Sequence, residues 1–223
     1  MAAIGETAGM VGHDIRNPLQ AIISDLYLLR STVSSSELAK STKKTEIIES
    51  LDSLDQNIEY ISKIIQDLQD YARPIKPDVH ETNIRPICEE VLLKNHVPDN
   101  VDASCQVEKE AEKVVTDPGL LKRILNNLVS NSVQAMPDGG RLDINAFREE
   151  NRTVITVSDT GLGIPEEFKG KLFTPLFTTK SRGQGFGLPV VKRITEALEG
   201  TVTYESEVGK GTKFILRLPH TRK

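Results

Sequence analysis

Two runs of apolar residues in the first third of the chain recur in alternating steps of three and four, and this heptad spacing constrains the fold most strongly. Residues 33–44, rich in Ser, Thr and Lys, separate the runs, and Pro74 and Pro77 end the second. We predict a helical hairpin over residues 1–77. The runs comprise Ile15, Leu19, Ile22, Leu26, Leu29 and Val33, then Leu51, Leu54, Ile58, Ile61, Ile65, Leu68 and Ala72.

A hairpin of two such helices leaves each apolar stripe half covered. Pairing with a second copy of the hairpin buries both stripes, which predicts a homodimeric four-helix bundle. The alternative is a hairpin that packs on the rest of its own chain.

After residue 77 the periodicity changes from heptads to short alternating segments. Alternation at 142–146, 153–157 and 213–218 predicts strands, and a helix should begin at Asp117 with Pro118 in its first position. A further helix is expected from about Leu188 to Leu198. Helices interleaved with strands predict an α/β sandwich with helices on one sheet face, so residues 78–223 form a second domain and the whole chain is α plus α/β.

Charge and hydropathy exclude some classes of partner. A formal net charge of -4 provides no basic surface for nucleic acid. No apolar stretch approaches the roughly 20 residues that span a bilayer, so we expect no membrane contact within this chain. Cys88 and Cys105 lack metal-site spacing and receive no function.

The segment His13-Asp14-Ile15-Arg16-Asn17-Pro18-Leu19 carries the first candidate chemistry. A neutral imidazole is a competent nucleophile, and the Asp14 carboxylate can hold one ring N–H of His13 and activate the other nitrogen. Asn17 lies one helical turn after His13, where its amide can orient a water molecule. We therefore predict His13, Asp14 and Asn17 as catalytic residues.

Three further motifs lie in the second domain. Asn127 and Asn131 are four residues apart and share one face of a helix. Asp159-Thr160-Gly161-Leu162-Gly163 follows a predicted strand, and Gly183-Gln184-Gly185-Phe186-Gly187-Leu188 precedes a predicted helix. Between the glycine motifs lie Phe173, Phe177, Lys180 and Arg182. Each motif alone also fits a plain structural role, such as exposed asparagines, an ordinary turn, core aromatics or solvated cations.

Together and in this order, the motifs resemble the H, N, G1, F and G2 boxes of sensor histidine kinases of two-component systems. The resemblance covers nearly the whole chain, and the His13 segment is closest in style to nitrogen-regulation sensor kinases. It implies a HisKA-type dimerisation and phosphoacceptor domain followed by a Bergerat-type catalytic domain that binds ATP. It also implies a transferase that autophosphorylates His13 and passes the phosphoryl group to an aspartate of a response regulator receiver domain.

By this resemblance Asn131 is the Mg²⁺ ligand and Asn127 lies near the phosphates. Asp159 accepts a hydrogen bond from the adenine amino group. An ionised carboxylate only accepts hydrogen bonds, so it favours a base with an amino group at that position over a base with a carbonyl there. Gly161 and Gly163 let the backbone approach the base, and Gly183, Gly185, Gly187 and Leu188 form a phosphate-binding turn. Phe173 and Phe177 anchor a nucleotide lid, with Lys180 and Arg182 offsetting phosphate charge.

A docking surface for the regulator is expected after the histidine, and Asn17 suggests a phosphatase activity toward the regulator. That surface comprises Gln20, Ala21, Ser24, Asp25 and Leu28. We expect a cytoplasmic chain, alone or as the cytoplasmic part of a membrane-bound sensor. Two alternatives stay open: a non-kinase ATPase of the gyrase, chaperone or MutL superfamily, and an ATP-binding scaffold in which His13 is idle.

Overall fold

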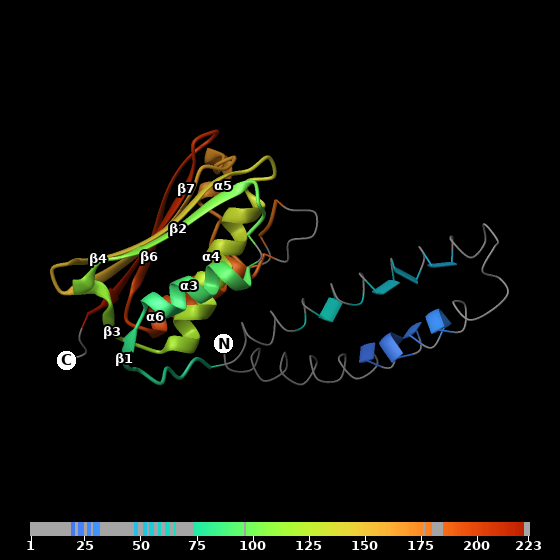
Figure 1. Cartoon of the computed structure of the whole chain (residues 1–223), viewed down its shortest axis with the longest axis horizontal. Coiled ribbons are helices and arrows are strands. Elements are labelled where there is room, and N and C mark those ends of the chain that lie inside the picture. Colours follow the sequence, from blue (N-terminus) through green and yellow to red (C-terminus); the bar gives the residue numbers. More distant parts are fainter. Residues whose placement is uncertain are drawn as a thin grey trace. The chain divides into compact units, whose positions relative to one another are not determined.

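The computed structural model describes two compact units, the first ending at Pro74 and the second beginning at Ile75 (Figure 1). In the second unit it describes residues 75–95, 97–175, 177–179 and 185–220, and in the first it describes Pro74 and a set of helical residues. That set is 19–20, 22–24, 26–27, 29–31, 47–48, 51–52, 54–55, 58, 61–62 and 65.

The first unit has its own apolar core between two helical segments. Residues one heptad apart on each segment meet there: Leu19, Leu26, Leu51, Ile58 and Ile65, with Ile23 packed against them. Arg30 on the first segment forms ion pairs with Asp52 and Asp55 on the second. The predicted helical hairpin is therefore present in the described residues.

A second row of apolar residues on the hairpin stays exposed. Its members are also spaced by sevens on each segment, and each is 40% to 55% exposed: Ile22, Leu29, Ile47, Leu54 and Ile61. Within the described hairpin, one set of heptad positions is thus buried in the single chain and the other is left open.

The second unit is built on a five-stranded mixed sheet in the order β2-β4-β5-β7-β6. β2 (Val101–Val107) pairs parallel with β4 (Gly140–Glu149), and the remaining pairings are antiparallel. The others are β5 (Arg152–Asp159), β6 (Thr201–Glu207) and β7 (Gly211–Pro219). A separate antiparallel pair joins β1 (His80–Asn83) to β3 (Lys113–Thr116).

Three helices cover one face of the five-stranded sheet (Figure 1): α3 (Arg85–Lys94), α4 (Pro118–Gln134) and α6 (Gly187–Ala197). The short α5 (Glu166–Lys169) and a 3₁₀ turn, η2 (Lys109–Ala111), lie in the connections.

The start of α4 follows from its sequence. The Asp117 side chain accepts a hydrogen bond from the backbone N–H of Leu120 at 3.0 Å, and Pro118 occupies the first turn, where no N–H is needed. The residues that α4 buries recur at helical spacing: Leu121, Ile124, Leu125, Leu128, Val129 and Ser132.

The predicted fold class is confirmed, as are the strands β4, β5 and β7 and the helices α4 and α6. The sequence reasoning missed β1, β2, β3, β6 and α3. Among the described residues, none of the helices is both long and apolar enough to cross a lipid bilayer.

Candidate functional site

The C-terminal half of α4 is the centre of the candidate site. Asn127 and Asn131 are half-buried on this helix, and the Asn127 amide donates to the Arg123 carbonyl at 2.9 Å, which fixes its orientation. A Cβ added to Gly187 would lie 3.0 Å from Asn127 Oδ1 and 4.0 Å from Asn131 Nδ2. The first residue of α6 therefore lies directly against both asparagines, and a larger residue there would press on the Asn127 amide.

Asp159 is the last residue of β5 and is only 7% exposed. Its Oδ1 accepts hydrogen bonds from the backbone N–H groups of Gly161 at 3.0 Å and Thr212 at 3.2 Å. Two N–H donors on one oxygen hold the carboxylate in a single orientation. A nearly buried, oriented acceptor of this kind suits recognition of an N–H group on a ligand.

Gly161 and Gly163 allow the loop after β5 to pass close to two other backbones. A Cβ at Gly161 would lie 2.4 Å from the carbonyl oxygen of Ala135, the C-cap residue directly after α4. Gly163 has φ +71°, and a Cβ there would lie 2.1 Å from the Glu207 carbonyl oxygen. These glycines were predicted to admit a base, and the structure adds a second reason, close approach to protein backbone.

The segment between the glycine motifs is held by aromatic contacts. The Phe173 ring lies 6.1 Å from the Tyr204 ring of β6, with Lys192 Nζ 5.9 Å from its centroid. Phe177 instead contacts Phe168 of α5, at 5.8 Å between ring centroids. Phe173 thus reaches the sheet, whereas the ring contact of Phe177 is made within its own segment.

Gly185 has φ +69°, a left-handed conformation that glycine adopts without strain, and Gly187 and Leu188 begin α6. Lys180, Arg182 and Gly183 lie outside the described residues, as do His13, Asp14 and Asn17. The described part of the chain contains no cluster of three or more His, Cys, Asp or Glu side chains that suits a metal ion.

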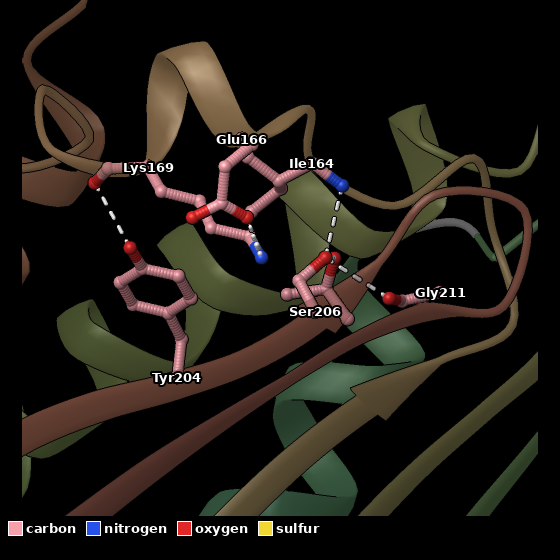
Figure 2. A network of polar contacts seen from close by, with 7 residues as sticks. Ile164, Glu166, Lys169, Tyr204, Ser206 and Gly211 are labelled. Atoms are coloured by element: carbon pink, nitrogen blue, oxygen red, sulfur yellow. Dashed lines mark hydrogen bonds and ion pairs between the residues drawn. The ribbon is translucent and has the colours of Figure 1, made fainter.

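The sequence reasoning missed a group of polar side chains from β6 and β7 behind Asp159. Ser206 Oγ accepts a hydrogen bond from Ile164 N at 2.9 Å (Figure 2). The same Oγ lies 3.0 Å from Thr212 Oγ1. Thr212 in turn donates its backbone N–H to Asp159.

Comparison with known proteins matches both units to protein families. Residues 3–76 match the His Kinase A (phospho-acceptor) domain, and residues 116–222 match the histidine kinase-, DNA gyrase B-, and HSP90-like ATPase family. Sporulation kinase A of Bacillus subtilis (strain 168) is 31% identical over 98% of this chain and 35% of its own length. The chain thus spans about a third of the length of such curated relatives.

Solved structures of histidine kinases resemble this chain as well. The catalytic domain of histidine kinase ThkA is 30% identical, with a TM-score of 0.59 over 65% of this chain and 97% of that domain. ThkA in complex with response regulator protein TrrA is 26% identical, with a TM-score of 0.67 over 98% of this chain and 62% of that one. Full-length ShkA in complex with AMPPNP shares the fold, with a TM-score of 0.80 over 98% of this chain and 46% of that one, at 21% identity.

The chain therefore belongs to the histidine kinases of two-component systems, and its second unit has the Bergerat ATP-binding fold.

Proposed function

We propose that this chain is the catalytic core of a sensor histidine kinase that binds ATP and autophosphorylates His13. One observation carries the proposal: two separated glycine motifs meet the same half of α4. Gly187 lies against Asn127 and Asn131, and Gly161 lies against Ala135, one turn further along. An oriented carboxylate, two amides and the N-terminus of α6 are thus assembled around one helix.

Each part of this assembly suits one part of ATP. The Asp159 carboxylate accepts a hydrogen bond from the adenine amino group. The N-terminus of α6, with the glycine turn before it, binds the phosphates. Asn131 is the proposed Mg²⁺ ligand and Asn127 lies beside the phosphates, because amide oxygens suit a hard cation that also binds phosphate oxygens. When bound, Mg²⁺ neutralises charge that develops on the phosphates during transfer. We further propose that Phe173 and Phe177 anchor the lid, and that Lys180 and Arg182 offset phosphate charge.

The phosphoryl acceptor is the N-terminal domain, residues 1–77, and the catalytic domain is residues 78–223. His13 is the nucleophile and Asp14 the base that holds its ring. The match of residues 3–76 to the phospho-acceptor family supports this assignment and disfavours the gyrase-like or scaffold alternatives. The His13 motif further suggests kinship with nitrogen-regulation sensor kinases, and the chain is proposed to act in the cytoplasm.

The proposed partner is a response regulator, whose aspartate receives the phosphoryl group. The ThkA–TrrA complex supports this class of partner. Gln20 and Ser24, two members of the predicted docking surface, are exposed on the hairpin. Asn17 is proposed to orient the water that removes phosphate from the regulator.

The hairpin is also proposed to form a homodimer. The exposed heptad row, Ile22, Leu29, Ile47, Leu54 and Ile61, has the spacing of the buried row and the residue types of a coiled-coil seam. A second copy presents the same row, so a twofold axis along the hairpin would cover both rows at once.

The test is incubation of the chain with γ-labelled ATP and Mg²⁺. We expect the parent chain to carry a label that is lost in acid and survives alkali, which is the behaviour of phosphohistidine. The His13→Gln variant should carry no label. His80→Gln is the matched control, because His80 is exposed on β1 of the other unit. ATP hydrolysis without label on the protein would support the non-kinase ATPase instead.

A further inference from the structure

The edge strand β6 holds the segment that leads into the proposed lid by two side chains. Tyr204 and Ser206 are two residues apart, so both project from the same face of β6, and both are half-buried. Ser206 Oγ accepts from Ile164 N, before α5, and Tyr204 OH donates to the Lys169 carbonyl at 2.9 Å, at the end of α5 (Figure 2). The two bonds hold α5 at both ends.

The Lys169 carbonyl needs such a donor. It belongs to the last residue of the four-residue helix α5, where carbonyl groups lack intrahelical partners. The Lys169 side chain is engaged elsewhere, because its Nζ pairs with Glu166 at 2.6 Å. Tyr204 therefore supplies a partner from the sheet for a group that α5 cannot satisfy itself.

The Tyr204 ring makes the second attachment. It lies 6.1 Å from the Phe173 ring on one side and 6.1 Å from the Phe214 ring of β7 on the other. Phe214 is 3% exposed and belongs to the core. Tyr204 thus joins the half-buried Phe173, which lies in a segment of short turns, to a rigid part of the sheet.

We infer that Tyr204 is a positioning residue for the nucleotide, holding residues 165–175 against β6 so that the lid begins from a fixed point. This inference rests on the proposed ATP site. Tyr204 takes no part in phosphoryl transfer itself, because it acts through Phe173 and the α5 backbone. Without its hydroxyl group, the segment would sample detached positions before ATP binds, and ordering it again would weaken ATP binding.

Tyr204→Phe tests this directly, because it keeps the ring contacts and removes only the hydroxyl group. Glu205→Gln is the matched control, since Glu205 is the exposed neighbour on the opposite face of β6. Three measurements apply to the whole chain: hydrogen exchange of the peptide over residues 165–175, the Kd for ATP by calorimetry, and the KM and kcat of autophosphorylation.

For Tyr204→Phe we expect faster exchange in this peptide and an approximately fivefold rise in both Kd and KM for ATP, equivalent to about 1 kcal/mol. The kcat at saturating ATP should stay within about twofold, because the lost interaction contributes to binding throughout the reaction. Glu205→Gln should match the parent in all three. Tyr204→Leu, which also removes the ring, should have a larger effect on the same quantities.

Unchanged exchange and unchanged ATP affinity in Tyr204→Phe would overturn the inference. A uniform rise in exchange over the whole sheet would also overturn it, since that result indicates a general structural role. Failure of the proposed function is recognised separately: a parent chain that binds ATP but carries no label on His13 refutes the kinase, while exchange and calorimetry still test Tyr204.

Discussion

Replacing Leu54 with alanine or aspartate tests the proposed dimer at the centre of the exposed heptad row. Leu54 is 48% exposed in the single chain. Full burial of a leucine side chain is worth roughly 1.5–3 kcal/mol, so covering its exposed half contributes about 1 kcal/mol per chain. Because a twofold axis repeats the contact, Leu54→Ala should cost about 2 kcal/mol, equivalent to an approximately 30-fold rise in the dimer dissociation constant.

Leu54→Asp should have a larger effect, because each copy would also bury an unpaired carboxylate, at a further cost of several kcal/mol. Sedimentation equilibrium over a concentration series measures both dissociation constants. Tyr27→Asp is the matched control: Tyr27 is 73% exposed on the same hairpin but lies outside the row, so its dissociation constant should equal that of the parent.

Unfolding by denaturant separates dimer loss from hairpin loss. Leu51→Ala changes a side chain that is 6% exposed in the hairpin core and should lower the stability of the hairpin itself. A Leu54→Asp chain that dimerises as tightly as the parent would refute the assignment of this row to the dimer interface.

Three further predictions concern the second unit. Asp159→Asn keeps an oxygen for the Gly161 and Thr212 N–H groups but turns an amide donor toward adenine, so ATP affinity should fall about 10- to 100-fold by calorimetry, with little loss of stability. Gly161→Ala places a Cβ 2.4 Å from the Ala135 carbonyl oxygen, and should lower the free energy of unfolding by about 1–3 kcal/mol in denaturant titrations. Burial lowers the pKa of His220 from its usual 6.5, so the folded state favours the neutral ring; denaturant midpoints should fall as pH drops below 6.5, and less so in His220→Gln.

Each of these three predictions has a result that would contradict it. Gly170→Ala is the control for the glycine substitution, because a Cβ there meets no atom within 4 Å, and equal losses in both variants would contradict the steric argument. An unchanged Kd in Asp159→Asn would remove Asp159 from the ATP site. The denaturant midpoint should fall with pH because, as pH falls, His220 becomes protonated in the unfolded chain before it does in the folded chain. A midpoint that rises on acidification, relative to His220→Gln, would refute this prediction.

The parts of the fold that were predictable are those with a strong burial pattern. β4 buries Leu142, Ile144 and Ala146 in strict alternation, and α4 buries six residues at helical spacing. β2 buries only its two end residues, Val101 and Val107, so nothing in its interior marks it as a strand. α3 buries only two residues and carries a weak periodic signal. Edge elements were missed because they bury too little for periodicity to show.

The residues of the candidate site also differ in how far the sequence could predict them. Glycines and asparagines in close succession were recognisable because their chemistry depends on short sequence spacing. Tyr204 and Ser206 were not, because their partners are backbone groups 35 and 42 residues away, and a backbone carbonyl or N–H carries no residue identity. Only the arrangement of β6 beside the loop after β5 reveals the contacts.

The β6–β7 hairpin accounts for more of the site than its sequence indicates. Thr212 orients the Asp159 carboxylate, Ser206 holds the loop after it, and Tyr204 holds the far end of α5. One two-stranded element therefore positions both the proposed base-reading group and the start of the proposed lid. A substitution that shifts this hairpin should alter base recognition and lid closure together, whereas Tyr204→Phe should affect the lid end and leave the preference for adenine over guanine unchanged.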